Sequence, residues 1–219
     1  MKKQSLFIRK IGAENYLSLF LIAAITTILL IRLFLKMTGY PQLGNAAGLH
    51  IAHMLWGGLL MMAAIVIAFS FVGRWPLQWV ALLGGIGFGA FIDELGKFLT
   101  HDNNYFFQPT VALIYFIFVL IFLIFRTLVV KEEFSEKEYL INALEEIEGI
   151  ALHTADQEAR KRMQQYLSKC DASNPLVKTF RRIFEAGHFL PEREPNFFIS
   201  LKQWLRVGYY RLTRLPGFS

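Results

Sequence analysis

Residues 82–98 read LLGGIGFGAFIDELGKF, and this stretch decides the fold class. It lies in an apolar run over residues 76–99, close to the roughly 20 residues that a helix needs to span a bilayer. Three similar runs cover about residues 16–37, 50–72 and 109–130. Backbone groups in lipid must find their hydrogen-bond partners within the segment, so we expect helices. The sequence predicts an all-α protein with a four-helix transmembrane bundle in residues 1–130.

Composition separates this region from the rest of the chain. Of the 219 residues, 54% are hydrophobic and 18% are charged, whereas soluble domains carry about a quarter charged residues. Residues 1–130 hold nine Lys or Arg and four Asp or Glu, and residues 131–219 hold fourteen and thirteen. The lone Cys170 excludes a scaffold of internal disulfides. The net charge of +6 forms no dense basic run and no nucleic-acid-binding motif, so we expect no nucleic acid partner.

Basic residues near the ends of the apolar runs predict the orientation in the membrane. They are Lys2, Lys3, Arg9, Lys10, Arg74, Arg126 and Lys131. All lie on one side of a four-span protein, and such residues favour the cytoplasmic side. We therefore expect a multi-pass protein of the cell (inner) membrane with both termini cytoplasmic. Arg32 and Lys36, at the other end of the first run, oppose this orientation. The first run is too long for the apolar part of a signal peptide, so it is interpreted as an uncleaved span.

The predicted outward ends of the spans carry an unusual set of polar residues. These are Arg32, Lys36, His50, His53, Asp93, Glu94, Lys97, His101, Asp102, Asn103 and Asn104. At a rise of about 1.5 Å per residue, Arg32, His53 and Asp93 lie some 5–10 Å inside the outer boundary. Segments far apart in sequence thus place charges at one depth. Charged residues inside a membrane are costly and are kept where they are paired or functional, so we expect a shared polar site.

Helical periodicity indicates which way some of these side chains point. Ala81, Gly85, Gly89, Asp93 and Lys97 follow one another at intervals of four residues. Rows of small residues mark close helix contacts in membranes, which predicts that Asp93 faces the bundle interior. His50 and His53 share a helix face with small residues and are also predicted to face inward. Glu94 is rotated about 100° from Asp93 and faces either a neighbouring helix or the headgroups.

This set of residue types suits several chemistries. Asp93, Glu94 and His53 are the predicted catalytic residues, and His50, His53 and Glu94 are the predicted ligands of a divalent metal such as zinc. A bound zinc with an open position would activate water for hydrolysis. The residues predicted to bind an ion or a lipid headgroup are Arg32, Lys36, Lys97, His101, Asp102, Asn103 and Asn104.

Three alternatives remain open at this level. The first is a proton- or ion-coupled carrier or channel subunit in which Asp93, Glu94 and His53 titrate. The second is a noncatalytic scaffold that recruits a partner through its tail. The third is structural, because Asp93 and Lys97 can neutralise each other at a spacing of four residues. The expected partners are the lipid bilayer, an ion or lipid ligand, and a second copy of the chain in a homo-oligomer.

Two stretches carry a resemblance to a known family. Residues 87–98 read GFGAFIDELGKF, and residues 102–107 read DNNYFF before the last apolar run. They resemble an uncharacterised bacterial family of small multi-span integral membrane proteins. The resemblance covers about residues 45–130, and the Asp-Glu-x-Gly-Lys-Phe segment is its most specific part. It implies the membrane architecture, and it implies neither an activity nor a role for the tail.

Residues 131–219 are predicted to form a cytoplasmic helical region. Ser135 followed by Glu138 matches a capping box and predicts a helix start, with one or two helices over 132–169. The predicted apolar side of this part consists of Phe134, Leu140, Leu144, Ile147, Ala151 and Leu152. The residues at 171–175 break the chain, and a shorter helix is predicted over 176–186.

A last helix is predicted over residues 197–212. Its aromatic and aliphatic residues are Phe197, Phe198, Leu201, Trp204, Leu205 and Tyr209, and the cations among and just after them are Lys202, Arg206, Arg211 and Arg214. This pattern is typical of an amphipathic helix at the inner leaflet of a membrane. It is equally consistent with a helix that docks on the acidic part of the tail.

Overall fold

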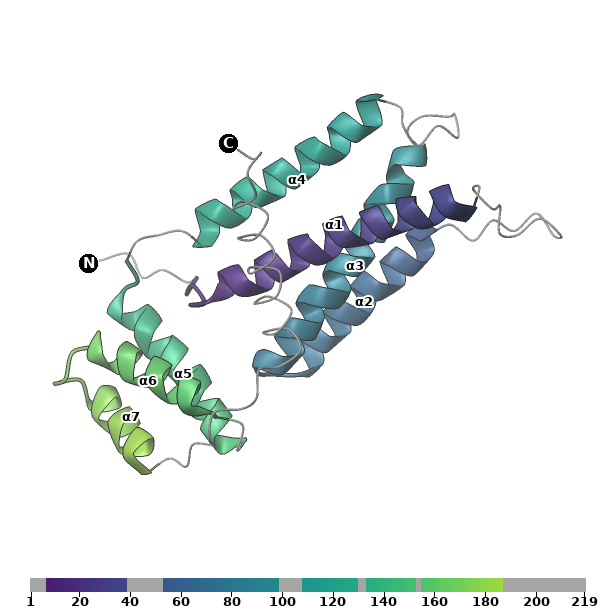
Figure 1. Ribbon diagram of the computed structural model, residues 1–219. Coiled ribbons are helices and arrows are strands. Elements are labelled where there is room, and N and C mark those ends of the chain that lie inside the picture. Colours follow the sequence, from purple (N-terminus) through teal and green to yellow (C-terminus); the bar gives the residue numbers. More distant parts are fainter. Residues whose placement is uncertain (1–6, 39–52, 99–107, 130–132, 153–154, 187–219) are drawn as a thin grey trace, which may run out of the picture. The chain divides into compact units, whose positions relative to one another are not determined.

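The computed structural model describes residues 7–38, 53–98, 108–129, 133–152 and 155–186. Within these ranges it describes the side chains of all but His53 and residues 95–98, 108–111 and 128–129. The helices, shown in Figure 1, are α1 (Ala13–Thr38), α2 (His53–Ser70), α3 (Arg74–Phe98), α4 (Gln108–Val129), α5 (Glu136–Ala151), α6 (Gln157–Ser168) and α7 (Pro175–Ala186). No strand occurs in these ranges, which confirms the all-α prediction. The chain divides into two compact units, Met1–Glu138 and Tyr139–Ser219.

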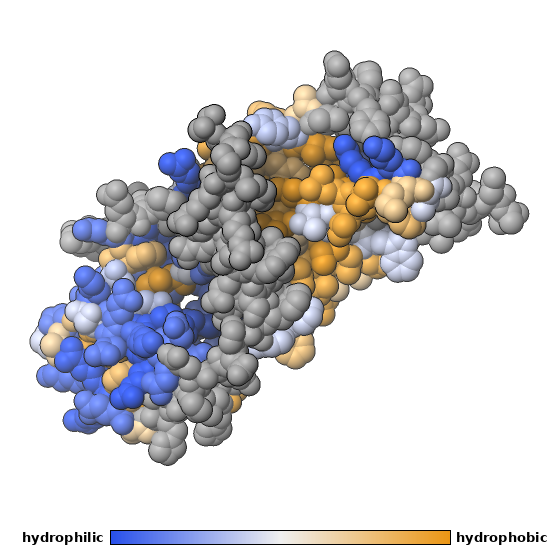
Figure 2. All heavy atoms as spheres, in the orientation of Figure 1, coloured by the Kyte–Doolittle hydropathy of each residue, from blue (hydrophilic) through white to orange (hydrophobic). Residues whose placement is uncertain are grey.

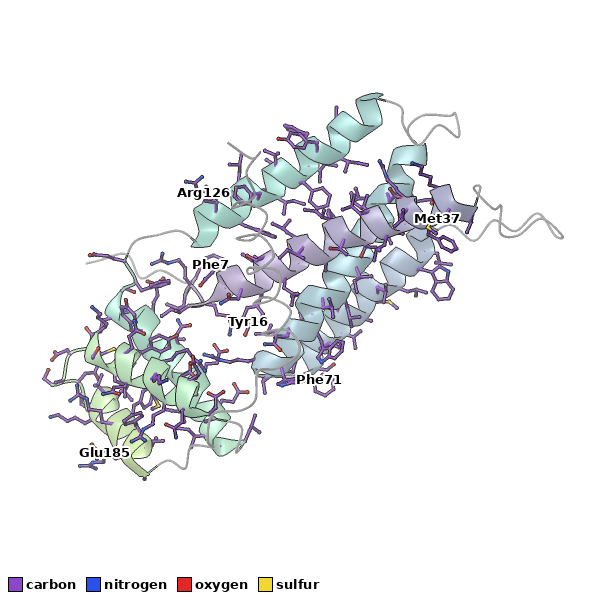
Figure 3. The ribbon with its side chains drawn as sticks, viewed as in Figure 1. Phe7, Tyr16, Met37, Phe71, Arg126 and Glu185 are labelled. Atoms are coloured by element: carbon purple, nitrogen blue, oxygen red, sulfur yellow. The ribbon has the colours of Figure 1, made fainter. Side chains whose placement is uncertain are left out.

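The four apolar runs correspond to α1 through α4. By length and composition, α1 and the part of α3 from Arg74 to Glu94 could cross a membrane. The apolar stretches of α2 (Met54–Ser70) and α4 (Ala112–Thr127) are shorter among the described residues. Figure 3 shows Phe7, Tyr16, Phe71 and Arg126 at one end of these helices and Met37 at the other.

The interior of the first unit is rich in small residues, and many large apolar residues lie on its outside. The exposed residues include Leu29, Leu30, Leu33 and Phe34 on α1, Leu55, Trp56 and Met62 on α2, and Tyr115 and Phe116 on α4. The buried residues include Ala23 and Ala24 on α1, Ala64 on α2, and Ala81 and Ala90 on α3. Figure 2 shows hydrophobic residues gathered over α1 to α3 and hydrophilic residues over α5 to α7. A water-soluble fold would bury the large side chains, so this distribution suits helices in an apolar solvent.

Glycines on two faces of α3 allow α1 and α2 to approach it closely. A Cβ atom added at Gly85 or Gly89 would collide with backbone atoms of α1, and Gly89 meets Ala24 there. On the other face, a Cβ at Gly87 would lie 2.6 Å from the carbonyl oxygen of Gly57, and a Cβ at Gly57 would lie 2.6 Å from that of Gly87. These contacts place α1 parallel to α3 and α2 antiparallel to it. They confirm that the predicted row of small residues is a helix contact.

Phenylalanine rings connect α4 to α1 and α3. The ring centroids of Phe20 on α1 and Phe88 on α3 are 5.6 Å apart. Phe118 on α4 lies 6.0 Å from Phe88, and Phe125 on α4 lies 6.3 Å from Phe20, both close to edge-on. Edge-to-face pairs at these distances contribute about 0.5–1.5 kcal/mol each beyond the burial of their area. They are the described contacts that locate α4 beside the other three helices.

The predicted capping box at the start of α5 is confirmed. Ser135 donates from its backbone nitrogen to Oε2 of Glu138 at 2.8 Å, and the Glu138 amide donates to Ser135 Oγ at 3.3 Å. Arg9 donates to both oxygens of the same carboxylate, from Nε at 2.6 Å and from Nη2 at 2.9 Å. The hydrogen bonds from Arg9 and Ser135 lower the pKa of Glu138 to about 2, although its burial acts in the opposite direction. Glu138 and Arg9 both belong to the first unit, so this cluster ties the residues before α1 to the first turn of α5.

In the second unit, α5 turns a partly polar face inward. Glu146 is 2% exposed and accepts from Nε of Arg162 on α6 at 2.9 Å. Asn142 is also buried, whereas Leu144 and Leu152 are 45% and 57% exposed. Leu144 and Leu152, two residues of the predicted apolar side, are therefore not part of this inward face. The reason is that Arg162, from a different helix, neutralises Glu146 and permits its burial.

The helices after α5 have clear ends. Asp156 caps α6 by accepting from the amide of Ala159 at 2.8 Å, and α7 begins at Pro175, where proline is favoured. Val177 and Phe180 on α7 are buried. The region predicted as 132–169 is thus two helices, and the helix predicted over 176–186 is confirmed. The helix predicted over 197–212 lies outside the described residues.

Candidate functional site

An ion pair between α1 and α3 forms the centre of the predicted polar site. Nε of Arg32 donates to Oδ1 of Asp93 at 2.8 Å. The Asp93 side chain is 3% exposed and the Arg32 side chain is 24% exposed. The direction predicted for Asp93, toward the bundle interior, is confirmed. Because Asp93 follows Gly85 and Gly89 at intervals of four residues, it meets α1 where the two helices are close.

Arg32 is bonded to Asp93 through only one nitrogen of its guanidinium group, Nε. Among the described residues, no acceptor is bonded to either of its terminal nitrogens. Lys36 follows one turn later on α1 and is exposed. Two cations at successive turns, one of them fixed by Asp93, can therefore meet a negatively charged group at this end of the helices.

Glu94 lies on a different side of α3 from Asp93. It is 2% exposed, and its helical position is on the side of α3 that carries Gly87, which contacts α2. Gly57 on α2 contacts residues 87 and 91, and Ala64 contacts Gly84, so the antiparallel register brings the backbone of His53 level with about residue 93. The structure thus directs Asp93 to α1 and brings Glu94 level with the first turn of α2.

The structure tests only part of the predicted site. Arg32, Lys36, Asp93 and Glu94 have described side chains, and of these Arg32 and Asp93 are in contact. The side chains of His53 and Lys97 are outside the described part. His50, His101, Asp102, Asn103 and Asn104 lie wholly outside it. Among the described residues, no group of three or more His, Cys, Asp or Glu lies close enough to hold a metal ion. The zinc site of His50, His53 and Glu94 therefore remains a prediction.

The sequence pattern predicts Arg32 and Asp93 at one depth but does not pair them. Their common depth was the signal that could have led to the pair, because a buried charge needs a partner within hydrogen-bond distance. An acidic residue on an apolar helix and a basic residue at the same depth on another helix are the natural candidates for such a partnership.

Comparison of the chain with family models, curated proteins and solved structures gave no match.

Proposed function

We propose that the chain is a multi-pass membrane protein in which all four helices α1 to α4 span the bilayer and both termini are cytoplasmic. The exposed large apolar residues and the buried Asp93 and Glu94 support this proposal. Met37 and Phe71, at opposite ends of the helices in Figure 3, provide a direct test. With Cys170 replaced by Ser, Met37→Cys should react with a membrane-impermeant maleimide in intact spheroplasts. Phe71→Cys should react only after lysis, and labelling of both in intact spheroplasts would contradict the topology.

For the site we propose that it binds the phosphate of an anionic lipid headgroup at the outer surface. The observation that carries the proposal is the way Asp93 holds Arg32 through Nε and leaves its terminal nitrogens to other acceptors. A guanidinium fixed in this way can donate two parallel hydrogen bonds to a phosphate, and ionic hydrogen bonds of this kind are about twice as strong as neutral ones. Lys36 adds a second cation one turn toward the end of α1.

The binding test uses purified protein in nanodiscs that contain either phosphatidylcholine alone or added phosphatidylglycerol. Native mass spectrometry should show anionic lipid retained by the wild type, with retention lost in Arg32→Gln and weakened in Lys36→Gln. The matched control is Arg126→Gln, which removes a cation from the opposite end of the helices (Figure 3). Equal retention by Arg32→Gln and by the wild type would refute the proposal.

Glu94 supports a second candidate, a proton- or ion-coupled carrier. Arg32 neutralises Asp93, and the adjacent Glu94 is a further acid that is 2% exposed and level with the start of α2. Buried acids of this kind serve as proton relays in transporters. Flux of protons or cations in proteoliposomes should then be lost in Glu94→Gln.

Metal-assisted hydrolysis predicts a different result. The purified protein should contain stoichiometric zinc, and the zinc should be lost in His53→Ala. If both variants leave every measured property unchanged, a scaffold role for the tail is the better explanation.

A further inference from the structure

The outward side of α5 carries a continuous stripe of apolar and acidic residues. Ile141, Leu144, Glu145 and Glu148 on α5 and Leu152, the residue after it, are spaced as i, i+3, i+4, i+7 and i+11, so they share one helix face. Ile141 is 48% exposed, Leu144 is 45% exposed and Leu152 is 57% exposed. We call these five residues the α5 stripe. A soluble unit gains by covering three large aliphatic side chains that lie in one row.

One carboxylate oxygen of the α5 stripe has no hydrogen-bond donor among the described residues. Oε1 of Glu148 is buried, and it accepts no hydrogen bond among the residues that the structure describes. Burying a carboxylate oxygen without a donor is unfavourable. The stripe thus calls for a partner that supplies both apolar area and positive charge.

The chain itself contains a segment with this chemistry. Residues 197–212 combine aromatic and aliphatic residues with cations, in a pattern that predicts an amphipathic helix. Ten residues separate it from α7, enough to reach about 33 Å when extended, whereas α5 is about 24 Å long. The two prolines in this connection, Pro191 and Pro195, favour a break before a new helix.

We propose that residues 197–212 dock on the α5 stripe of the same chain. The aromatic and aliphatic residues of the segment cover Ile141, Leu144 and Leu152, and one of its cations donates to Glu148. Charge complementarity and chain length support this occupant, because the cations of the segment match the acids of the stripe and the connection is long enough to reach it. The docked segment completes a four-helix cytoplasmic unit.

Limited trypsin digestion of the full-length protein in detergent tests the proposal, since the segment contains Lys202, Arg206 and Arg211 as cleavage sites. Cleavage at these sites should become about tenfold faster in Glu148→Lys, which corresponds to a loss of about 1.4 kcal/mol of docking free energy. The matched control is Glu185→Lys, the same charge change at an exposed residue of α7, and it should cleave like the wild type. Equal cleavage rates in Glu148→Lys and the control would overturn the proposal.

A cross-linking experiment covers the case in which Glu148→Lys destabilises α5 itself. With Cys170 replaced by Ser, Leu144→Cys is combined in turn with cysteine at 201, 204 or 205, and at least one pair should form an intrachain disulfide under mild oxidation. Lys178→Cys on α7, an exposed position, should form none with the same partners. Absence of every Leu144 cross-link would overturn the proposal. Protection from trypsin that appears only when anionic vesicles are added would also overturn it, and would assign the segment to the membrane surface.

Discussion

Replacing either of two adjacent glycines of α2 by alanine should change the stability of the protein in opposite directions. A Cβ atom at Gly57 would lie 2.6 Å from the carbonyl oxygen of Gly87 and 2.8 Å from the backbone nitrogen of Phe91. A Cβ atom at Gly58 would meet nothing within 4 Å. Both substitutions are identical in chemistry and lie one residue apart in the same helix. Gly57→Ala should therefore destabilise the contact between α2 and α3, and Gly58→Ala should not.

The size of the effect follows from the distances. Ordinary van der Waals contacts of a Cβ atom begin at about 3.4 Å, so the two backbones would have to separate by about 0.8 Å at Gly57. A gap of this size forfeits a quarter to a half of the dispersion energy of each contact along the interface. Overpacking of this kind costs about 1–3 kcal/mol, whereas replacing glycine by alanine in a helix gains about 0.5–1 kcal/mol. We expect Gly57→Ala to lose up to about 2.5 kcal/mol and Gly58→Ala to gain up to about 1 kcal/mol.

The assay is unfolding in mixed micelles, driven by added SDS and followed by far-UV circular dichroism. The midpoint should fall in Gly57→Ala and rise slightly in Gly58→Ala relative to the wild type. A Gly57→Ala protein as stable as Gly58→Ala would refute the close approach of α2 and α3.

Three further predictions concern charged groups. Because the hydrogen bonds from Arg9 lower the pKa of Glu138 to about 2, that carboxylate stabilises the fold above about pH 4.5 and loses this contribution as the pH falls through about 2. A ¹³C NMR titration of Glu138 should show the low midpoint in the wild type and a midpoint shifted toward 4.5 in Arg9→Gln. Asp93→Asn should destabilise the protein by about 3–5 kcal/mol in the SDS assay because Arg32 keeps an unpaired charge, whereas the joint change of Arg32→Met and Asp93→Leu should be close to neutral. Asp156→Ala should cost about 0.5–2 kcal/mol through loss of the α6 cap, measured as a lower thermal midpoint of the second unit.

The parts of the fold that depend on local sequence could be predicted. The apolar runs correctly located α1 to α4, and the capping box at Ser135 located the start of α5, because both signals lie within the element they define. The row of small residues that includes Gly85 and Gly89 correctly predicted that Asp93 faces the interior of the helix bundle. Small residues at intervals of four describe a surface that another helix can approach, whichever helix that is.

The features that depend on contact between different helices could not be predicted from the sequence. Nothing in the periodicity of α3 says that its Asp93 faces α1 and not α2 or α4, so the partner Arg32 was found only in the structure. On α5, Leu144 is exposed and Glu146 is buried, because Arg162 of α6 pairs with Glu146 and permits its burial. A sequence pattern describes one helix, whereas the burial of a charge depends on what a second helix supplies.

The bond between Arg32 and Asp93 also has a consequence for the order of biosynthesis. The two residues are 61 positions apart, so α1 has left the ribosome before Asp93 is translated. In a chain that enters the membrane as proposed, α1 first meets the translocon with its guanidinium unmatched, and such a residue makes partitioning into lipid less favourable. Integration of α1 should therefore become more stable once α3 is present, and truncating the nascent chain before residue 93 should leave α1 easier to extract from the membrane with alkali.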